Sequence, residues 1–283
     1  MTVRRLSAGL VAAALFTPTL AACNASGPGT AGGTPSPTTT VSPSASASGG
    51  APVAGDAKQA LLDSTKEISN GNFRFSLVGA GSTAEGQVHQ PSQSATMKVS
   101  LGGPSSDLAM KLDVIHAKPD SWAKLELTGP TADSLPALKQ LNLGKYQHLD
   151  QSRIKGNRSL GFDFEKFDPA GSAVLTQGIT EVRSTGTGAY AGTIDITKAA
   201  EAGSLNAATI AALGTQAKTV PFTAKVDPQG RLSELVLQIP AAGQTTAQEI
   251  KMTYSDYGAA TAAQKPPADQ VVEAPSELYG LFG

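Results

Sequence analysis

The sequence predicts an α+β domain built on one large antiparallel sheet, and three observations lead to that prediction. Segments of about seven residues alternate apolar and polar side chains, as half-buried strands do. Glycine, proline, asparagine or aspartate separates many of these segments, as expected for turns. Only about four stretches carry apolar residues at helical spacing. We therefore expect about nine to eleven strands and about four short helices that cover one face of a curved sheet.

The first half of the domain is predicted to be a helix followed by a meander. Asp56 is the expected N-cap of the helix, and Asn70-Gly71 is expected to end it, because both residues tolerate the left-handed conformation. The period of the apolar residues then changes to two. The predicted strands lie near residues 73–77, 84–90, 95–101, 108–114 and 122–127.

The second half mixes helices and hairpins. Helices are predicted at residues 131–141, 168–179 and 206–213, while residues 145–155 are ambiguous. Asp227-Pro228-Gln229-Gly230 is predicted to be a turn between two clearly alternating segments. The tail after Gly258 is rich in alanine and proline, and we expect it to lie across the surface. The predicted strands lie near residues 181–185, 190–197, 222–226, 235–239 and 250–254.

The N-terminal residues look like a targeting segment. Residues 1–22 begin with Arg4-Arg5 and continue as an apolar run that is too short to span a bilayer of about 30 Å. Leu20-Ala21-Ala22-Cys23 resembles a bacterial lipobox, in which the signal peptide is cleaved before the cysteine and the thiol is acylated. The resemblance implies a lipid anchor on the extracytoplasmic face of the cell membrane. The alternative is an ordinary secretory signal with an incidental cysteine.

Residues 23–55 are interpreted as the acylated cysteine and a disordered tether. No charged residue occurs from Asn24 to Gly55, and the segment consists largely of Pro, Ser, Thr, Gly and Ala. Such a composition offers little apolar surface to offset the entropy of folding. The tether would span about 30 Å as a flexible coil and about 100 Å as extended polyproline. The folded domain is expected to occupy residues 56–283.

Composition argues against several classes of function. The chain has 22 Lys and Arg against 23 Asp and Glu, which gives no basic surface for nucleic acid. A single cysteine forms neither an intramolecular disulfide nor a thiolate metal site. His89, His116 and His148 fall on different predicted elements, where we expect each to be exposed. We predict no metal and no cofactor.

Short motifs that suggest chemistry lack their context. Ser121 and Lys124 fit the Ser-x-x-Lys pattern of penicillin-interacting enzymes, but the partner motifs are missing, so we predict that the protein is not an enzyme. Gly186-Thr187-Gly188 imitates a dinucleotide fingerprint between two strands and is expected to be a turn. Asp163, Glu165 and Asp168 form either a calcium site or a charged loop. Trp122 is either a packed indole or a platform for a ligand.

The areas of the predicted elements raise the question of what covers the sheet. Nine strands of about seven residues present an apolar face of roughly 1000 Å². Four short helices cover only about 700 Å² of it. The sheet therefore curls on itself, dimerises or binds an apolar ligand. We favour a curled sheet with a ligand inside, and the alternative is an interior filled by the protein's own side chains.

The order of elements resembles the LppX/LprA/LprF/LprG-type lipoproteins of actinobacteria, which share a fold with the LolA/LolB lipoprotein carriers. The resemblance rests on the lipobox, the tether, the opening from Ala60-Leu61-Leu62 to Phe73-Arg74-Phe75, and two later segments, residues 220–232 and 253–258. It implies a half-barrel around a central helix, an apolar cavity, and binding of lipids or lipidated glycans. A membrane transporter is a possible partner.

The predicted function is thus a membrane-anchored carrier that shields acyl chains within the cell envelope. The alternative is a sensor similar to RseB, a relative of the same fold, that binds a protein partner. The alternating apolar residues are the predicted lining of the cavity. This set consists of Phe73, Phe75, Leu77, Met97, Val99, Leu101, Leu108, Met110, Leu112, Ile194, Phe222, Leu235, Leu237, Ile250 and Met252.

Overall fold

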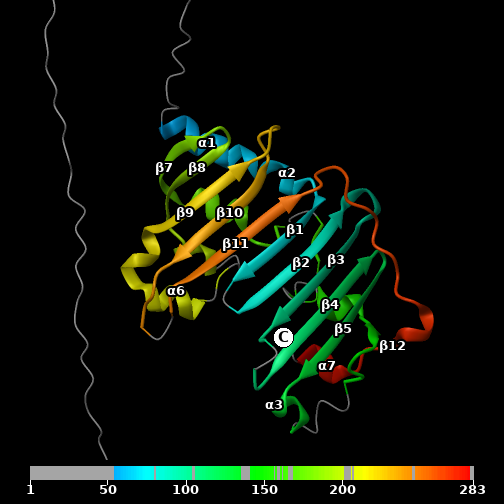
Figure 1. The fold of residues 1–283 in the computed structure, drawn as a ribbon. Helices are drawn as coiled ribbons and strands as arrows, with labels where there is room; N and C mark the ends of the chain where they lie inside the picture. Colours follow the sequence, from blue (N-terminus) through cyan, green and yellow to red (C-terminus); the bar gives the residue numbers. More distant parts are fainter. Residues whose placement is uncertain are drawn as a thin grey trace, which may run out of the picture. The chain divides into compact units, whose positions relative to one another are not determined.

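A single twelve-stranded sheet dominates the computed structural model (Figure 1). The structure describes residues 54–79, 81–103, 106–134, 141–155, 157, 160, 162–164, 168–200, 205, 207–243 and 246–280. The strand order is β12-β6-β5-β4-β3-β2-β1-β11-β10-β9-β8-β7. Every neighbouring pair is antiparallel except β12 and β6, which are parallel. The predicted α+β class with a large antiparallel sheet is confirmed.

The strands follow the predicted alternation closely, and most of them form hairpins with the next strand in the chain. Their bounds are β1 Asn72–Gly79, β2 Ser82–His89, β3 Ser94–Leu101, β4 Ala109–Ala117, β5 Asp120–Thr128, β6 Tyr146–His148, β7 Ile179–Gly186, β8 Ala189–Ile194, β9 Val220–Val226, β10 Leu232–Ile239, β11 Gln248–Ser255 and β12 Val271–Glu273. β1 pairs with β11 and thereby joins the two halves of the sheet.

The helices are short and more numerous than expected. The described residues form seven α-helical segments, and the short 3-10 turns η1, η3, η4 and η5 accompany them. The longest helix, α1, has 11 residues, and no described helix is long and apolar enough to cross a membrane. Their bounds are α1 Ala54–Ser64, α2 Lys66–Ser69, α3 Pro130–Asp133, α4 Gln151–Ile154, α5 Ser172–Gln177, α6 Ala207–Leu213 and α7 Ser276–Gly280.

The first helix begins before the predicted position. Asp56 lies within the first turn of α1, so the prediction that it is the N-cap is wrong. A carboxylate in the first turn still interacts favourably with the helix dipole. Gly71 adopts φ +62° and ends the helical region, whereas Asn70 keeps a right-handed conformation. Glycine supplies the left-handed residue here because it has no Cβ to clash.

Turn chemistry in the β9–β10 hairpin follows the prediction. Asp227 Oδ1 accepts hydrogen bonds from the backbone N–H groups of Gln229 and Arg231, each at 2.9 Å. The Asp227 carboxylate also accepts a bond of 2.7 Å from Arg231 Nε. Gly230 adopts φ +80°. These bonds fix the register in which β9 and β10 pair, and so they position Leu235 opposite Ala224.

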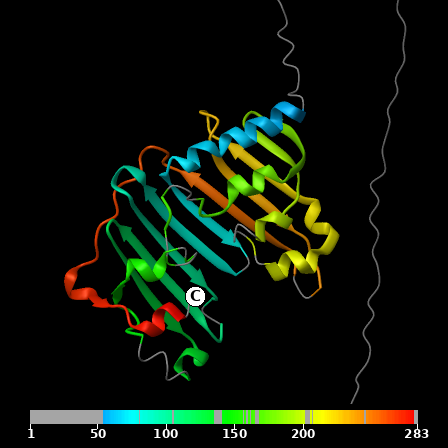
Figure 2. The same cartoon turned by 180° about the vertical axis from the view of Figure 1, so that it is seen from behind.

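The helices gather on one face of the sheet, which we call the inner face (Figure 2). Helix α1 packs against β7, and α5 packs against α1. Helices α4 and α7 lie over the opposite half of the sheet, near β4–β6 (Figure 2). The other side of the sheet, which we call the outer face, carries polar and charged side chains of β2–β5, such as Glu85, Lys98 and Lys111. The two faces therefore offer different chemistry. Most apolar residues of the strands lie on the side of the helices, while Ile115 and Trp122 have the parity of the outer face.

Three regions depart from the prediction. The ambiguous residues 145–155 form β6 and α4, and α3 is a single turn at residues 130–133. Residues 135–140 of the predicted helix lie outside the described residues. The tail forms β12 and α7 in addition to crossing the surface, because Val272 pairs with Gln147 and Leu278 is fully buried.

Candidate functional site

The register of β1–β5 arranges the inner-face side chains in rows that run across the strands. Leu77 is opposite Ala84, Ala84 is opposite Val99, and Val99 is opposite Leu112. The next row toward the β3–β4 turn contains Leu101, Met110 and Leu127. Directly opposite residues in antiparallel strands point to the same face. The alternating pattern in the sequence thus becomes a continuous apolar surface.

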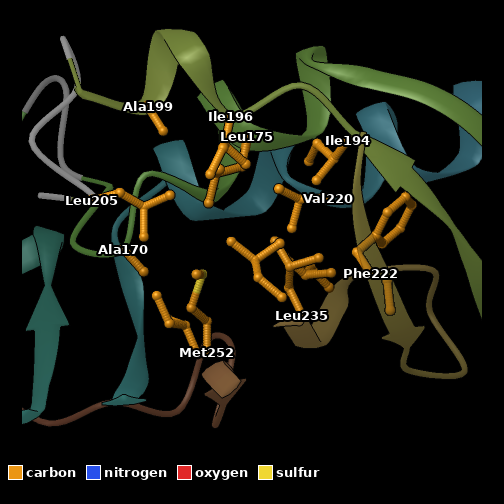
Figure 3. Packing of buried hydrophobic residues seen from close by; sticks show 14 of the residues in the cluster. Ala170, Leu175, Ile194, Ile196, Ala199, Leu205, Val220, Phe222, Leu235 and Met252 are labelled. Carbon is orange, nitrogen blue, oxygen red and sulfur yellow. The ribbon is translucent and has the colours of Figure 1, made fainter. Parts of the chain in front are cut away.

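One half of this surface is packed core. Side chains of β8–β11 lie under α1, α5 and α6, and Ile194, Phe222, Leu235, Leu237 and Met252 have at most 2% of their surface exposed. Figure 3 shows Leu175, Ile194, Val220 and Leu235 pointing toward one another. Burial of this kind supplies most of the stability of a domain. This half of the inner face is therefore structural as it stands.

The other half is less covered at one end. Leu101 is 41% exposed although its parity on β3 is that of the inner face, and Leu108, in the bend just before β4, is 44% exposed. The remaining apolar residues of this end are half-buried. We call Leu77, Val99, Leu101, Leu108, Met110 and Leu127 the open end of the inner face. Exposed apolar side chains that gather in one place are typical of interaction or ligand-binding surfaces.

A second hydrophobic cluster lies next to the open end. Leu112, Val114, Ala123 and Leu125 of β4 and β5 pack with Leu149, Ile154, Leu160 and Leu278. The open-end residues Val99, Met110 and Leu127 pack against this cluster. Met97 contacts both clusters and thus connects the two halves of the inner face. Methionine suits such a position because its side chain is flexible and polarisable.

The fifteen predicted lining residues divide between core and open end. Phe73, Phe75, Leu112, Ile250 and the five core residues above are buried. Leu77, Met97, Val99 and Met110 are half-buried, and Leu101 and Leu108 are exposed. The structure brings the other fourteen onto one sheet face, while Leu108 lies outside the sheet in the bend just before β4. Burial alone does not decide which of them contact a ligand, so the lining role stays a prediction.

His116 contradicts its predicted exposure. It lies on the inner face of β4 with 6% of its surface exposed. Its Nδ1 shares a hydrogen bond of 2.6 Å with Ser121 Oγ, and its ring lies 5.0 Å from the ring of Phe162. Desolvation lowers the pKa of His116 to about 4, so the imidazole is neutral near pH 7. The parity of the strand already placed this histidine inside, together with Leu112 and Val114.

A second buried polar group joins α5 to the sheet. Ser172 Oγ and Tyr254 Oη lie 2.8 Å apart, and Tyr254 Oη donates to Asp168 Oδ1 at 3.3 Å. Asp168 Oδ2 accepts from the backbone N–H of Ala173 at 2.8 Å. Burial raises the pKa of Asp168 and raises the pKa of Tyr254 well above its usual value. Asp168 thus accepts a hydrogen bond from the first turn of α5. This contact gives one member of the predicted acidic cluster a structural role.

Gln147 differs from these groups. Gln147 is fully buried, and neither its Nε2 nor its Oε1 has a hydrogen-bond partner. It lies on β6 opposite Ala123, so it belongs to the inner face. Sequence analysis missed Gln147 because residues 145–155 gave no clear period. A parity assignment for β6 would have found it.

The outer face of β2–β5 holds a polar hollow of about 390 Å³. Its lining consists of Thr83, Glu85, Lys98, Ser100, Lys111, Asp113, Lys124 and Glu126. Lys124 Nζ lies 3.2 Å from Glu126 Oε1, and this hydrogen bond is the main cause that raises the pKa of Lys124. Acidic and basic side chains are equal in number here. The hollow therefore suits contact with a polar partner and is unfavourable for an acyl chain.

The remaining candidate sites can be compared with the positions that the structure gives to their residues. No group of three or more His, Cys, Asp or Glu side chains in the described part of the chain is arranged to hold a metal ion. Glu165 of the predicted acidic cluster lies outside that part. Gly186–Ala189 forms the β7–β8 turn, as predicted. Trp122 is 6% exposed. Its ring centroid lies 5.9 Å from that of His148 and 5.6 Å from Lys265 Nζ. These contacts fit a packed indole.

The predicted acylation site is not among these features, since Cys23 lies outside the described residues. Comparison with known proteins adds no assignment: neither a protein-family model nor a curated protein matches the chain.

Proposed function

We propose that this protein is an extracytoplasmic lipoprotein that binds acyl chains of a lipid or lipidated glycan on its inner face and carries them within the cell envelope. The observation that carries the proposal is the open end, where apolar side chains of one continuous surface remain exposed beside a packed core. A ligand chain covering Leu101, Leu108 and Met110 removes that apolar surface from water. The half-barrel and the lipid anchor at Cys23 belong to the same proposal.

The energetics of the proposal require no catalytic residue. Each buried methylene contributes about 0.8 kcal/mol, so a sixteen-carbon chain gains on the order of 10 kcal/mol before the costs of binding. Met97 and Met110 lie along the surface and adapt to a flexible tail. The inner-face helices provide the wall against which the chain packs.

A protein-binding role is the second candidate, and the outer face favours it. Alternating charges around the 390 Å³ hollow give a surface that a complementary protein recognises. In that case the inner face is a structural core with a partly exposed edge. Lipid in an organic extract of the purified protein favours the carrier, whereas a clean extract with a co-purifying protein favours the second candidate.

Met110→Arg is expected to remove lipid binding while the fold persists. Met110 is half-buried at the open end, so an arginine there reaches water but places a charge where the acyl chain packs. We expect the lipid recovered by mass spectrometry of an organic extract to fall about tenfold, because a charge placed against the chain costs at least the roughly 1.4 kcal/mol that this factor represents. The Cys23→Ala background allows purification without detergent.

The control for this experiment is Thr83→Arg, which adds the same charge on the exposed outer face of β2. It should leave lipid recovery unchanged. Circular dichroism and thermal unfolding establish that both variants are folded. A folded Met110→Arg protein with undiminished lipid removes the open end from the binding site.

Cys23→Ala is expected to release the protein from the membrane fraction. The thiol is the predicted attachment point of the acyl chains, and two such chains anchor a protein stably. Fractionation of the native host, followed by immunoblotting, measures the distribution. Ser26→Ala, which alters only the tether, should keep the protein in the membrane fraction. Retention of Cys23→Ala in salt-washed membranes contradicts the anchor.

A further inference from the structure

Gln147 is a buried amide without a hydrogen-bond partner on the largely apolar inner face. Gln147 has no exposed surface, and its Nε2 and Oε1 both lack a hydrogen bond. Leaving such a group unpaired shifts the folding equilibrium toward the unfolded state by about 5- to 150-fold. Native proteins keep few unpaired groups of this kind, and each calls for an explanation in structure or function.

The neighbouring buried polar groups show how this protein treats the same problem elsewhere. His116 shares a hydrogen bond with Ser121, and Ser172 shares one with Tyr254. Both pairs bring their partner from another strand or helix of the inner face. Gln147 is the only described residue with both side-chain polar atoms buried and unpaired. Its amide is thus available to a partner that the chain itself does not supply.

Register places the amide on the same surface as the open end. Gln147 is opposite Ala123, Ala123 is opposite Val114, and Val114 is opposite Met97. The row thus reaches Met97, the residue that contacts both hydrophobic clusters of the inner face. Met110 lies four residues from Val114 on β4, and β6 is two strands away from β4. Strand rise and spacing then separate the Met110 and Gln147 positions by about 16 Å.

The chemistry of the surroundings limits the partner. A carboxamide donates and accepts hydrogen bonds at once, as does a hydroxyl group. The buried polar side chains of the described residues are those of Ser, Thr, His116, Gln147 and Tyr254, and none of them is ionised near pH 7. None of them offers a charge to pair with a charged group of the ligand. A charged head group therefore stays in water at the margin of the open end, and the acyl chain begins against Met110. The group at Gln147 is neutral and lies well inside the molecule.

We propose that Gln147 binds a hydroxyl group carried within the acyl chain of the ligand, about 16 Å from the head group. This inference rests on the proposed function and names the class of ligand as hydroxylated acyl chains. An extended hydrocarbon chain covers this distance in about twelve carbons, given C–C bonds of about 1.5 Å in a zigzag. The chain reaches the amide by displacing side chains of the second cluster beneath α4 and α7.

The test compares 12-hydroxystearic acid with stearic acid, which differ by one hydroxyl group in the middle of the chain. Both displace N-phenyl-1-naphthylamine from the delipidated full-length Cys23→Ala protein. We expect the hydroxylated acid to bind about five- to tenfold more tightly, the usual effect of one buried hydrogen bond. Gln147→Met, which has similar shape without the polar atoms, should abolish this preference. Gln147→Leu is the second variant.

Gln90→Leu provides the matched control. Its Oε1 is also buried without a partner, but it lies in η1, outside the row of Gln147. The preference of the Gln90→Leu variant for 12-hydroxystearic acid over stearic acid should equal that of the unsubstituted protein. Thermal unfolding gives an independent measurement: Gln147→Met should raise the melting temperature of the ligand-free protein by a few degrees.

The outcomes separate the two proposals. Equal binding of the two acids by the unsubstituted protein, or an unchanged preference in Gln147→Met, overturns the role of Gln147 and leaves the acyl-chain carrier intact. A lower melting temperature in both Gln147 variants overturns it as well, because it means that the amide is paired within the protein. If neither acid displaces the dye, the carrier function fails and this inference fails with it.

Discussion

Leu235→Ala is expected to lower the free energy of unfolding by about 3–4 kcal/mol. Leu235 is fully buried on β10, where it lies opposite Ala224 of β9 and Met252 of β11. Truncation removes apolar contacts and leaves a cavity that the surrounding strands fill only in part. The loss is a large fraction of the 5–15 kcal/mol that stabilises a typical domain. Urea denaturation monitored by circular dichroism measures it.

Leu101→Ala is the matched control, since it removes the same atoms from a leucine that is 41% exposed at the open end. We expect it to cost less than about 1 kcal/mol, because little buried surface is lost. Equal losses in the two variants would show that the distinction between packed core and open end is wrong. The pair therefore tests the division of the inner face by stability alone.

Acid is expected to destabilise the protein between about pH 6.5 and pH 4 through His116. The pKa of His116 is about 4 in the folded protein and near 6.5 in an unfolded chain. Within this window the unfolded state binds a proton that the folded state does not bind, so stability falls as the pH falls. The contribution is absent above pH 6.5. It reaches about 3 kcal/mol below pH 4, at about 1.4 kcal/mol per pKa unit.

The measurement is urea denaturation at several pH values for the unsubstituted protein and His116→Gln. Glutamine keeps a polar partner for Ser121 without titrating. Asp168 acts in the opposite sense, because burial raises the pKa of its carboxyl and protonation at low pH stabilises the folded state. It is present in both proteins, so their difference isolates His116. Parallel curves from pH 7 to pH 4 would contradict the assignment.

Local patterns were enough to predict most of the sheet. Phe73, Phe75 and Leu77 alternate with polar residues, and they form β1 because period two matches the pleat. Asp227 and Gly230 predicted a turn whose hydrogen bonds the structure contains. These features depend on side chains within a few residues of one another. The sequence displays such information directly.

Features that depend on distant residues were missed. β12 has three residues and pairs with β6, more than 120 positions away, so no local period reveals it. Asp56 was misassigned because the helix extends back to Ala54, where cap preference competes with continued helical hydrogen bonding. The number of helices was underestimated for a similar reason. Single turns such as α2 and α4 are stabilised by packing of Ile68 and Ile154.

The candidate site was predictable as a surface but not as a boundary. Leu101 and Leu235 have the same residue type and the same strand parity, yet one is exposed and the other is core. Apolar alternation reports which face a side chain joins, and the covering helices decide how deeply it is buried. His116 shows the same limit, because its parity was correct while its residue type suggested exposure. Gln147 required knowledge of β6 that the sequence pattern did not contain.

The position of β12 has a consequence for biosynthesis. Because β12 follows β6 by more than 120 residues, a growing chain passes through a stage in which β6 has no neighbour on that side of the sheet. Unpaired margins recruit strands from other molecules. A chain truncated between Gly258 and Val271 would keep the other eleven strands and leave this edge of β6 unpaired. Residues 271–273 therefore protect the edge of β6 from pairing with other molecules, in addition to completing the sheet.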